Sequence, residues 1–408
     1  MLQPDYLLRV SEGAEDIAEQ LHQDIIRRIV SRMMARLGRG EDYLLTATDK
    51  WQIQTLQEAG YLLEDITAEL AKRTKQQQEE VKAAMEDAGV TALQYDDRIY
   101  QAAGLSPAPL EQSPHLIRLM QRNYEATMGE WKNFTRTTAQ AAQTLFIREM
   151  DKAYHLTTSG AISYTQAVKE AVEAVASQGV AVTYPSGRKD TIETATLRAV
   201  RTGIAQATGA IQIARMEEMD WDIILVSAHL GARTGDGGQN PGNHLWWQGQ
   251  YYSRTGRTKE FPNFYEVTGY GTVTGLDGAN CRHSFGSGTG RPEDNSFRDI
   301  ETADNYKVEE LNKRQRLLER RIRKTKREVM GLQTAVDNCQ NEQLKFELDM
   351  QYQRKAALLQ EQNKAYNDFC KQNNLKKLND RIQIAQWSRE QAARARGAAK
   401  RYQNAKGE

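Results

Sequence analysis

Long hydrophobic runs are missing from this sequence of 408 residues. The strongest apolar stretches, such as Ile223-Ile224-Leu225-Val226, fall far short of the roughly 20 residues that cross a bilayer. The first residues contain no basic segment that leads into an apolar one, as a secretory signal would. We therefore expect no membrane span, no secretory signal and no membrane partner.

Cysteine is scarce as well. The three cysteines, Cys281, Cys339 and Cys370, are an odd number and lie far apart, so they do not form the framework of a disulfide-rich fold. Free thiols of this kind suit a protein made in a reducing cytoplasm.

Proline is rare and unevenly placed. Its eight copies leave the intervals 5–106, 115–184 and 293–408 without any. Because an internal proline removes a hydrogen bond and clashes with the preceding turn, these intervals permit long helices. Apolar residues amount to 39% of the chain, below the usual roughly 45–50%, so we expect much of that helix to be solvated.

Apolar periodicity and glycine predict where the N-terminal helices end. Apolar residues recur every four positions over 17–37, which predicts a helix that stops at Gly38. A further, polar helix over 76–87 should stop near Gly89. Residues 104–114 are rich in proline and are predicted to form a linker before the next helix.

The middle of the chain has a different composition. Fourteen of the 29 glycines lie within residues 231–290, and ten of the 31 aromatic residues lie within 221–285. Alternating or continuous β-branched residues predict strands over 180–184 and 221–227. Because so many glycines lose much conformational entropy on ordering, buried aromatic residues, docking on helices or a metal must hold this segment.

The C-terminal part is helical and basic. Residues 301–408 hold 24 Lys and Arg against 15 Asp and Glu, whereas residues 1–300 hold 31 against 39. Apolar residues three and four apart, from Leu311 to Val336, predict a coiled coil or a helical hairpin with a break at Asp337.

Together these patterns predict a mainly α fold. Long helices and a C-terminal coiled coil or helical hairpin should flank a small α+β, Gly- and aromatic-rich Cys/His module. We expect four consecutive regions: an N-terminal helical region over 1–110, a helical region with a short hairpin over 111–220, the Cys/His module over 221–297 and a basic coiled-coil region over 298–408.

The Cys/His module gives the strongest chemical signal. His229 follows a predicted strand, and Cys281 and His283 are two positions apart, so an extended backbone would point both side chains to one face. With His244 they complete a set of one cysteine and three histidines that zinc accepts, and we favour a closed structural site. The spacing is not that of a standard zinc finger, and the plainer interpretation is that these side chains bond to backbone or pack singly.

A metal-dependent nuclease or toxin-like enzyme is the alternative, with a metal-activated water in a loop-rich pocket. No nucleophile elbow and no paired His-Glu helix motif supports an enzyme. The glycine loop over 235–238 lacks the Lys-Ser/Thr pair of a phosphate-binding loop. We therefore expect no enzymatic activity, no catalytic residues and no small-molecule substrate.

A basic run over 313–327 holds nine positive charges and one negative charge. We expect Arg316, Arg320, Arg323 and Arg327 to face away from the apolar seam, toward an acidic protein surface or packaged double-stranded DNA. A solvated helix face is the plainer interpretation, and no base-reading motif is present.

Several segments carry a family resemblance. They are the series His229-Leu-Gly-Ala-Arg, Gly-Asn-His244-Leu-Trp-Trp-Gln-Gly and Gly-Leu-Asp-Gly-Ala-Asn-Cys281-Arg282-His283-Ser. This pattern resembles the second class of minor capsid proteins of tailed phages, which is similar to the Mu F-like head-morphogenesis proteins. Those usually carry Cys-x-Cys after the asparagine, whereas this chain has a histidine at the second position. The start of the chain, the turn at 184–188 and the helix at 366–370 resemble the same family.

The resemblance implies a low-copy structural protein of the virion head that is made in the host cytoplasm and acts in capsid assembly near the portal. It implies the portal protein and other capsid proteins as partners. It implies no catalytic set and no cofactor, so a structural zinc is an inference from the residues alone. A host coiled-coil adaptor is a third class that the helical flanks leave open.

Overall fold

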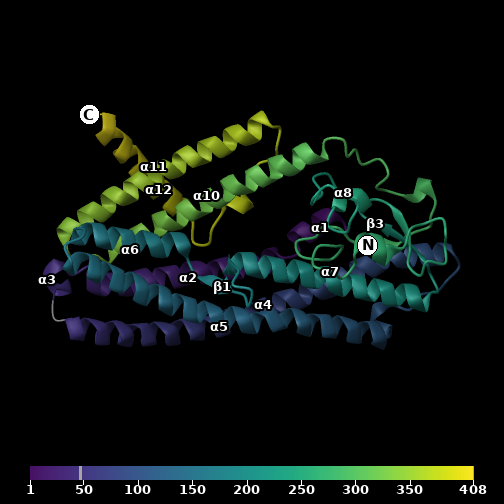
Figure 1. Cartoon of the computed structure of the whole chain (residues 1–408), viewed down its shortest axis with the longest axis horizontal. Coiled ribbons are helices and arrows are strands. Elements are labelled where there is room, and N and C mark those ends of the chain that lie inside the picture. Colours follow the sequence, from purple (N-terminus) through teal and green to yellow (C-terminus); the bar gives the residue numbers. More distant parts are fainter. Residues whose placement is uncertain (46–47, 408) are drawn as a thin grey trace. The chain divides into compact units, whose positions relative to one another are not determined.

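The computed structural model of the chain describes residues 1–45 and 48–407 (Figure 1). The chain forms two compact units, each assembled from three separate segments. Unit 1 comprises Met1–Glu15, Lys75–Lys132 and Thr194–Asn312, and unit 2 comprises Asp16–Thr74, Asn133–Glu193 and Lys313–Glu408. The four consecutive regions expected from the sequence stay a prediction, because each compact unit combines segments that are far apart in the sequence.

Most of the described chain is helical, as the proline-free intervals predict. The α-helices are α1 (Pro4–Arg9), α2 (Glu12–Leu37), α3 (Glu41–Leu44), α4 (Thr48–Ala102), α5 (Pro114–Thr158), α6 (Tyr164–Gln178), α7 (Ile192–Glu218), α8 (His244–Trp247), α9 (Phe264–Thr268), α10 (Asn305–Asp337), α11 (Glu342–Gln372) and α12 (Arg389–Gly407). Short 3₁₀ helices are η1 (Leu110–Gln112), η2 (Pro292–Asp294) and η3 (Asp380–Ile382). The predicted end of α2 before Gly38 and the predicted linker after α4 are confirmed.

The strands are short, and two of them lie within the segments 180–184 and 221–227 that the sequence predicts to be strands. They are β1 (Ala181–Thr183), β2 (Lys189–Thr191), β3 (Ile223–Val226), β4 (Tyr251–Ser253) and β5 (Phe285–Ser287). In unit 2, β1 and β2 form an antiparallel hairpin. In unit 1, an antiparallel sheet has the order β4-β3-β5, so β3 is its central strand. The predicted fold class, mainly α with a small α+β part, is confirmed.

Helix α4 corrects the prediction of a break near Gly89. It is one helix of 55 residues that continues through this glycine. A Cβ atom at Gly89 would lie 2.9 Å from Met120 Cε and 3.3 Å from Ile211 Cδ1. Small size for close packing, rather than helix termination, therefore explains the glycine.

An aromatic core surrounds the central strand of unit 1. Ile224 and Val226 belong to one buried cluster, which also contains Met216, Trp247, Tyr252, Phe264, Leu276, Cys281 and Phe285. Leu225 points to the other face of the sheet and packs with Tyr251 and Phe297. Because both faces of β3 are buried, its sequence is continuously apolar rather than alternating.

One carboxylate organises the loop after β4. Asp222 accepts hydrogen bonds from the hydroxyl groups of Ser253 (2.6 Å), Thr255 (2.6 Å) and Thr258 (2.6 Å). It also accepts from the backbone N–H of Thr255 (2.8 Å). Burial opposes its charge, but these hydrogen bonds outweigh burial and hold the pKa of Asp222 below its usual range.

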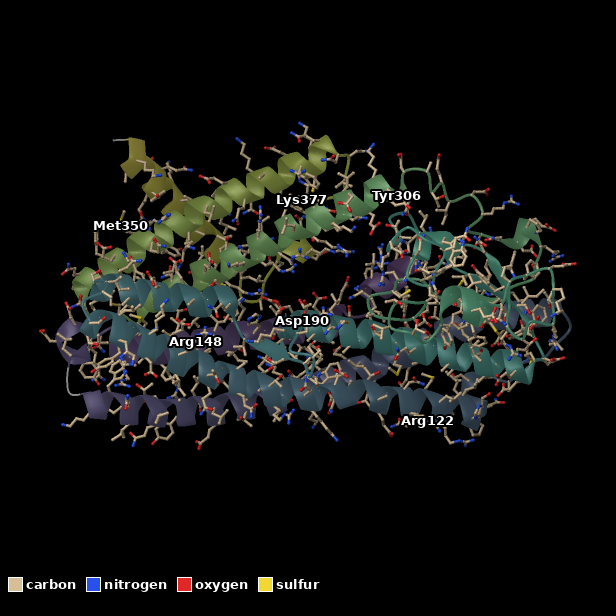
Figure 2. All side chains as sticks on the ribbon, viewed as in Figure 1. Arg122, Arg148, Asp190, Tyr306, Met350 and Lys377 are labelled. Atoms are coloured by element: carbon tan, nitrogen blue, oxygen red, sulfur yellow. The ribbon has the colours of Figure 1, made fainter. Side chains whose placement is uncertain are left out.

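The predicted C-terminal helical hairpin is confirmed in unit 2. Helix α10 ends at Asp337, and the side chain of Asn341 caps α11 by accepting from the Leu344 N–H (2.9 Å). The two helices run side by side in Figure 1, and Ile322 of α10 shares a buried cluster with Leu359 of α11. Charged side chains extend from the helices and from the loop after α11, where Lys377 lies (Figure 2).

Candidate metal centre

The predicted Cys/His residues come from three places in unit 1. His229 follows β3, His244 begins α8, and Cys281 and His283 lie directly before β5. The side chain of Asn243 caps α8, which fixes the start of the short helix and hence the position of His244. His229 and His283, which are 54 positions apart in the chain, are thus brought together by the central sheet.

Three of these four residues converge. Nδ1 of His244 lies 3.3 Å from Nδ1 of His283, and the Cys281 Sγ lies 3.8 Å and 3.7 Å from the same two atoms. All three side chains are buried. Their ligand atoms lie within 4.8 Å of one another, close enough to share one ion.

Hydrogen bonds at the far side of each ring orient the two imidazoles. His244 Nε2 lies 2.8 Å from the carbonyl oxygen of Thr274. His283 Nε2 lies 2.9 Å from Oε1 of Gln248, and that oxygen also accepts from the backbone N–H of His229 (3.0 Å). Metal-binding histidines commonly donate their second N–H to such a carbonyl or amide oxygen.

Burial determines the charge of the cluster when no cation is bound. It lowers the pKa of His244 to about 4, against the hydrogen bond to Thr274. Burial and the neighbouring His229 and His244 lower the pKa of His283 well below its usual value. Burial also raises the pKa of the Cys281 thiol to about 12. At neutral pH the group then consists of two neutral imidazoles and one thiol.

His229 occupies a different position from the other three. Its ring stacks on the ring of His283, with centroids 4.4 Å apart and an interplanar angle of 21°. Nη2 of Arg282 lies 3.2 Å from its Nδ1. Of the four predicted ligands, the structure therefore brings His244, Cys281 and His283 to one point and places His229 as a cover on His283.

Aromatic packing closes the centre. The Trp247 ring lies 4.5 Å from the His244 ring and 4.9 Å from the His283 ring, centroid to centroid. Its indole N–H donates to the carbonyl oxygen of Pro241 (3.0 Å). A buried centre enclosed in this way suits the holding of loops together better than the admission of a substrate.

Two partners of the histidines were not predicted from the sequence. Gln248 stands four positions after His244 in the Trp-Trp-Gln-Gly segment, a spacing that gives a weak signal at best. The carbonyl group of Thr274 gives no signal, because every residue has one. Only the folded loops show that these two groups are hydrogen-bond partners of the histidines.

The four arginines of the basic run do not share one environment. Arg316 and Arg320 are exposed on α10. Arg323 is half-buried and donates to the carbonyl oxygen of Arg381. The predicted contact of these three residues with an acidic protein surface or with DNA stays a prediction.

The prediction was wrong for Arg327, which is buried. Its Nη2 lies 2.6 Å from Oε2 of Glu19 and 2.7 Å from Oε1 of Glu193. Burial opposes the charge of Glu193, but Arg327 and His22 outweigh it and hold the pKa of that carboxyl well below its usual range. The five consecutive residues over 325–329 are all buried, so this part of α10 has no solvated face.

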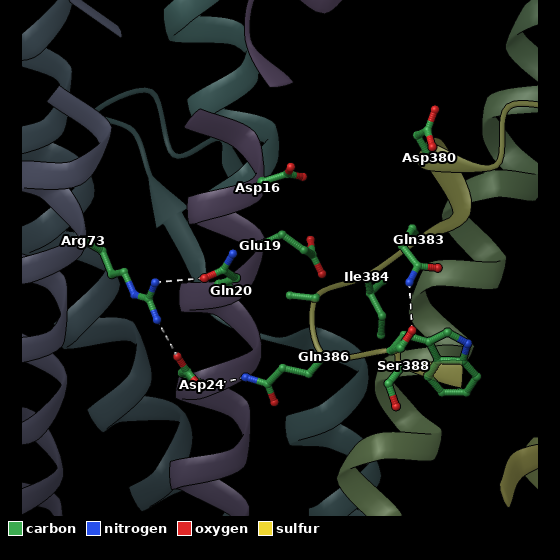
Figure 3. A pocket seen from close by; sticks show the side chains of 12 residues that line it. Asp16, Glu19, Gln20, Asp24, Arg73, Asp380, Gln383, Ile384, Gln386 and Ser388 are labelled. Carbon is green, nitrogen blue, oxygen red and sulfur yellow. Dashed lines mark hydrogen bonds and ion pairs between the residues drawn. The ribbon is translucent and has the colours of Figure 1, made fainter. Parts of the chain in front are cut away.

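A cavity of about 480 Å³ lies in unit 2 (Figure 3). Asp24 receives hydrogen bonds there from Nη2 of Arg73 (3.3 Å) and Nε2 of Gln386 (2.8 Å). Burial and the nearby Asp380 raise the pKa of Asp16, which also lines the cavity. The described lining groups bond largely to one another, and they contain no nucleophile next to a base.

None of the described helices combines the length and the apolar content that crossing a bilayer requires. Comparisons with curated proteins and with solved structures gave no match.

The family comparison gave one match. Residues 2–370 fit the family model described as phage minor capsid protein 2, a span that includes the Cys/His module and the helical hairpin up to Cys370. This family consists of structural capsid proteins, so membership supports a role in the capsid and a location in the virion. It does not support the nuclease alternative. A match over nearly the whole chain identifies this protein as a member of the phage minor capsid protein 2 family.

Proposed function

We propose that this chain is a low-copy structural component of the phage head, which acts in head assembly close to the portal. The family match over residues 2–370 carries this proposal, because it covers segments of both compact units. Other capsid proteins are partners of any such component, and the portal is the partner we propose in particular.

The long helices support a role in contacts rather than in chemistry. Helix α4 has 55 residues and α5 has 45, so at about 1.5 Å per residue they extend roughly 80 Å and 70 Å. Helices of this length present large surfaces to neighbouring proteins. Among the described residues we identify no set of side chains arranged for catalysis.

The testable consequence is a defect at the head vertex. An amber mutation in the gene for this chain should lower the yield of infectious particles, and chemical cross-linking of wild-type heads should join this chain to the portal protein. Normal infectivity without the chain would contradict the proposal. Cross-links that reach only capsid proteins distant from the portal would contradict its location.

We also propose a partner surface in unit 2, the arginine surface, formed by Arg316, Arg320, Arg323 and Arg381. Burial is the main cause that lowers the pKa of Arg316; the charges of Arg381 and Arg320 act in the same direction, and Glu319 opposes them. Among the described residues, Arg316 and Arg320 have no ion-pair partner. An acidic surface of another head protein would relieve this repulsion.

A double charge reversal tests the arginine surface. R316E/R320E should reduce the yield of assembled heads at least tenfold, with unchanged helical content of the purified chain. R118E/R122E is the matched control, because these arginines are also exposed and four positions apart, on α5 (Arg122 is labelled in Figure 2). Normal assembly with both variants would contradict the proposal. Normal assembly with reduced DNA content would contradict the protein partner and identify DNA in its place.

A further inference from the structure

We propose that His244, Cys281 and His283 bind one zinc-class transition-metal ion through Nδ1, Sγ and Nδ1, and that this ion ties α8 to the segment before β5. The proposal concerns the stability of the Cys/His module and does not depend on the role in head assembly. It stands on three observations: the tautomers, the distances and a contrast with a second cluster.

The tautomer of His244 follows from its partner. Nε2 lies 2.8 Å from the Thr274 carbonyl oxygen, which can only accept a hydrogen bond. Nε2 therefore carries the proton of the neutral ring. Nδ1 is left with a lone pair, and it points at His283 and Cys281.

The tautomer of His283 follows from the orientation of the Gln248 amide. Oε1 of Gln248 accepts from the backbone N–H of His229 (3.0 Å), so this atom is the oxygen and not the nitrogen of the amide. The same Oε1 lies 2.9 Å from His283 Nε2, which must donate to it. Nδ1 of His283 is thus also a lone-pair atom.

Two lone pairs consequently face each other at 3.3 Å inside a buried site. The thiol of Cys281 has one proton and can satisfy only one of the two nitrogens. Leaving a buried acceptor without a donor destabilises the folded state. A metal ion accepts a lone pair from all three atoms, and the thiol proton leaves to solvent as the metal–sulfur bond forms.

The distances fit a tetrahedral ion. Zinc bonds of about 2.0–2.1 Å to nitrogen and about 2.3 Å to sulfur, at tetrahedral angles, separate two nitrogens by about 3.3–3.4 Å and nitrogen from sulfur by about 3.6 Å. The corresponding separations in the structure are 3.3 Å between the nitrogens and 3.8 and 3.7 Å from sulfur to nitrogen. The three atoms therefore form one face of a coordination tetrahedron with little rearrangement.

A second buried cluster shows what a satisfied group looks like. In unit 2, Glu19, His22 and Glu193 also hold ligand atoms within 4.8 Å of one another. There, the backbone N–H of Val180 donates to His22 Nε2 (3.2 Å), so the proton of the neutral ring lies on Nδ1. This Nδ1–H donates a hydrogen bond to Glu193 (2.8 Å). Arg327 supplies the positive charge. This cluster leaves no facing lone pairs, and we expect no metal in it.

Metal content and the cobalt spectrum of the full-length chain test the proposal. After removal of metal and incubation with zinc, the wild type should retain about one zinc ion per chain, and cobalt should give a thiolate-to-metal charge-transfer band in the near ultraviolet. C281S should abolish the band and weaken zinc binding at least tenfold. C370S is the matched control, because Cys370 is equally buried but lies in unit 2.

The test does not depend on the folding of C281S. The double variant C339S/C370S keeps Cys281 as the last thiol and should keep the full charge-transfer band. Loss of the band in that variant would contradict the proposal, as would less than about a tenth of an equivalent of zinc in the wild type. H229A should retain zinc, and a loss as large as that of C281S would contradict the three-residue set.

Discussion

The tautomers of His244 and His283 are decided by atoms that would not touch the proposed metal ion. Each ring is held by an acceptor at Nε2, and this leaves Nδ1 with the lone pair that we propose as the metal ligand. The four ligand candidates were predictable from residue type and spacing. Their division into three converging side chains and one stacked cover was not, because it depends on the loop that carries Gln248.

The first prediction concerns Gln248. Q248A should weaken zinc binding about 10–100-fold, because the His283 ring loses the acceptor that fixes its tautomer. Q250A serves as the control, since Gln250 is exposed and donates to the Trp246 carbonyl oxygen instead. Competition with a chromogenic chelator measures both affinities. Equal affinities for Q248A and the wild type would show that this hydrogen bond is dispensable.

The second prediction concerns Arg327. R327A should lower the free energy of unfolding by about 3–5 kcal/mol, because the buried Glu19 loses its ion-pair partner and the buried Glu193 keeps only its hydrogen bond with His22. R320A removes an exposed arginine from the same helix and should change it by less than about 0.5 kcal/mol. Urea unfolding followed by circular dichroism compares the two. Similarly small losses of stability for R327A and R320A would contradict the prediction and would favour a solvated position for Arg327.

At the scale of elements, glycines in helices illustrate the limit of reading breaks from sequence. Gly38 follows the end of α2, whereas Gly89 lies in the middle of α4 and makes room for Met120. The two cannot be told apart by periodicity, because the difference lies in a neighbouring helix. The burial of Arg327 escaped prediction for the same reason. Strands β1 and β3 and the break after Asp337 were predictable, because local composition decides them.

A pair of glycine substitutions in unit 1 makes this point measurable. A Cβ atom at Gly203 in α7 would clash with Oγ1 and Cγ2 of Thr127, whereas one at Gly129 in α5 would meet nothing within 4 Å. G203A should therefore destabilise the chain by about 1–3 kcal/mol. G129A should stabilise it by about 0.5–1 kcal/mol, because alanine has less conformational freedom to lose. Thermal unfolding midpoints that move in the same direction would contradict the prediction.

The loop held by Asp222 gives a pH-dependent prediction. Its pKa is lower in the folded chain than in the unfolded one, so the folded state binds fewer protons and stability rises with pH. The contribution is fully present above the unfolded pKa of about 3.9 and is lost as pH falls below it. D222N should lower the melting temperature at pH 7 and should show a smaller further loss between pH 5 and pH 3 than the wild type. Parallel curves for the two proteins would contradict this origin of acid sensitivity.

At the scale of the whole molecule, the chain combines long helical surfaces with one small module that has little regular structure. The described strands of the module are short, so aromatic packing, the hydrogen bonds to Asp222 and the buried Cys/His cluster hold its loops in place. Family membership indicates the capsid role, and the contacts of these residues explain how the module stays folded.

The central claim is that this chain is a structural part of the phage head. Quantitative mass spectrometry of purified, DNA-filled virions tests it most directly. We predict peptides from the whole chain, 1–408, at a copy number far below that of the major capsid protein and constant from one preparation to the next. Abundant chain in infected cells together with its absence from purified virions would contradict the claim.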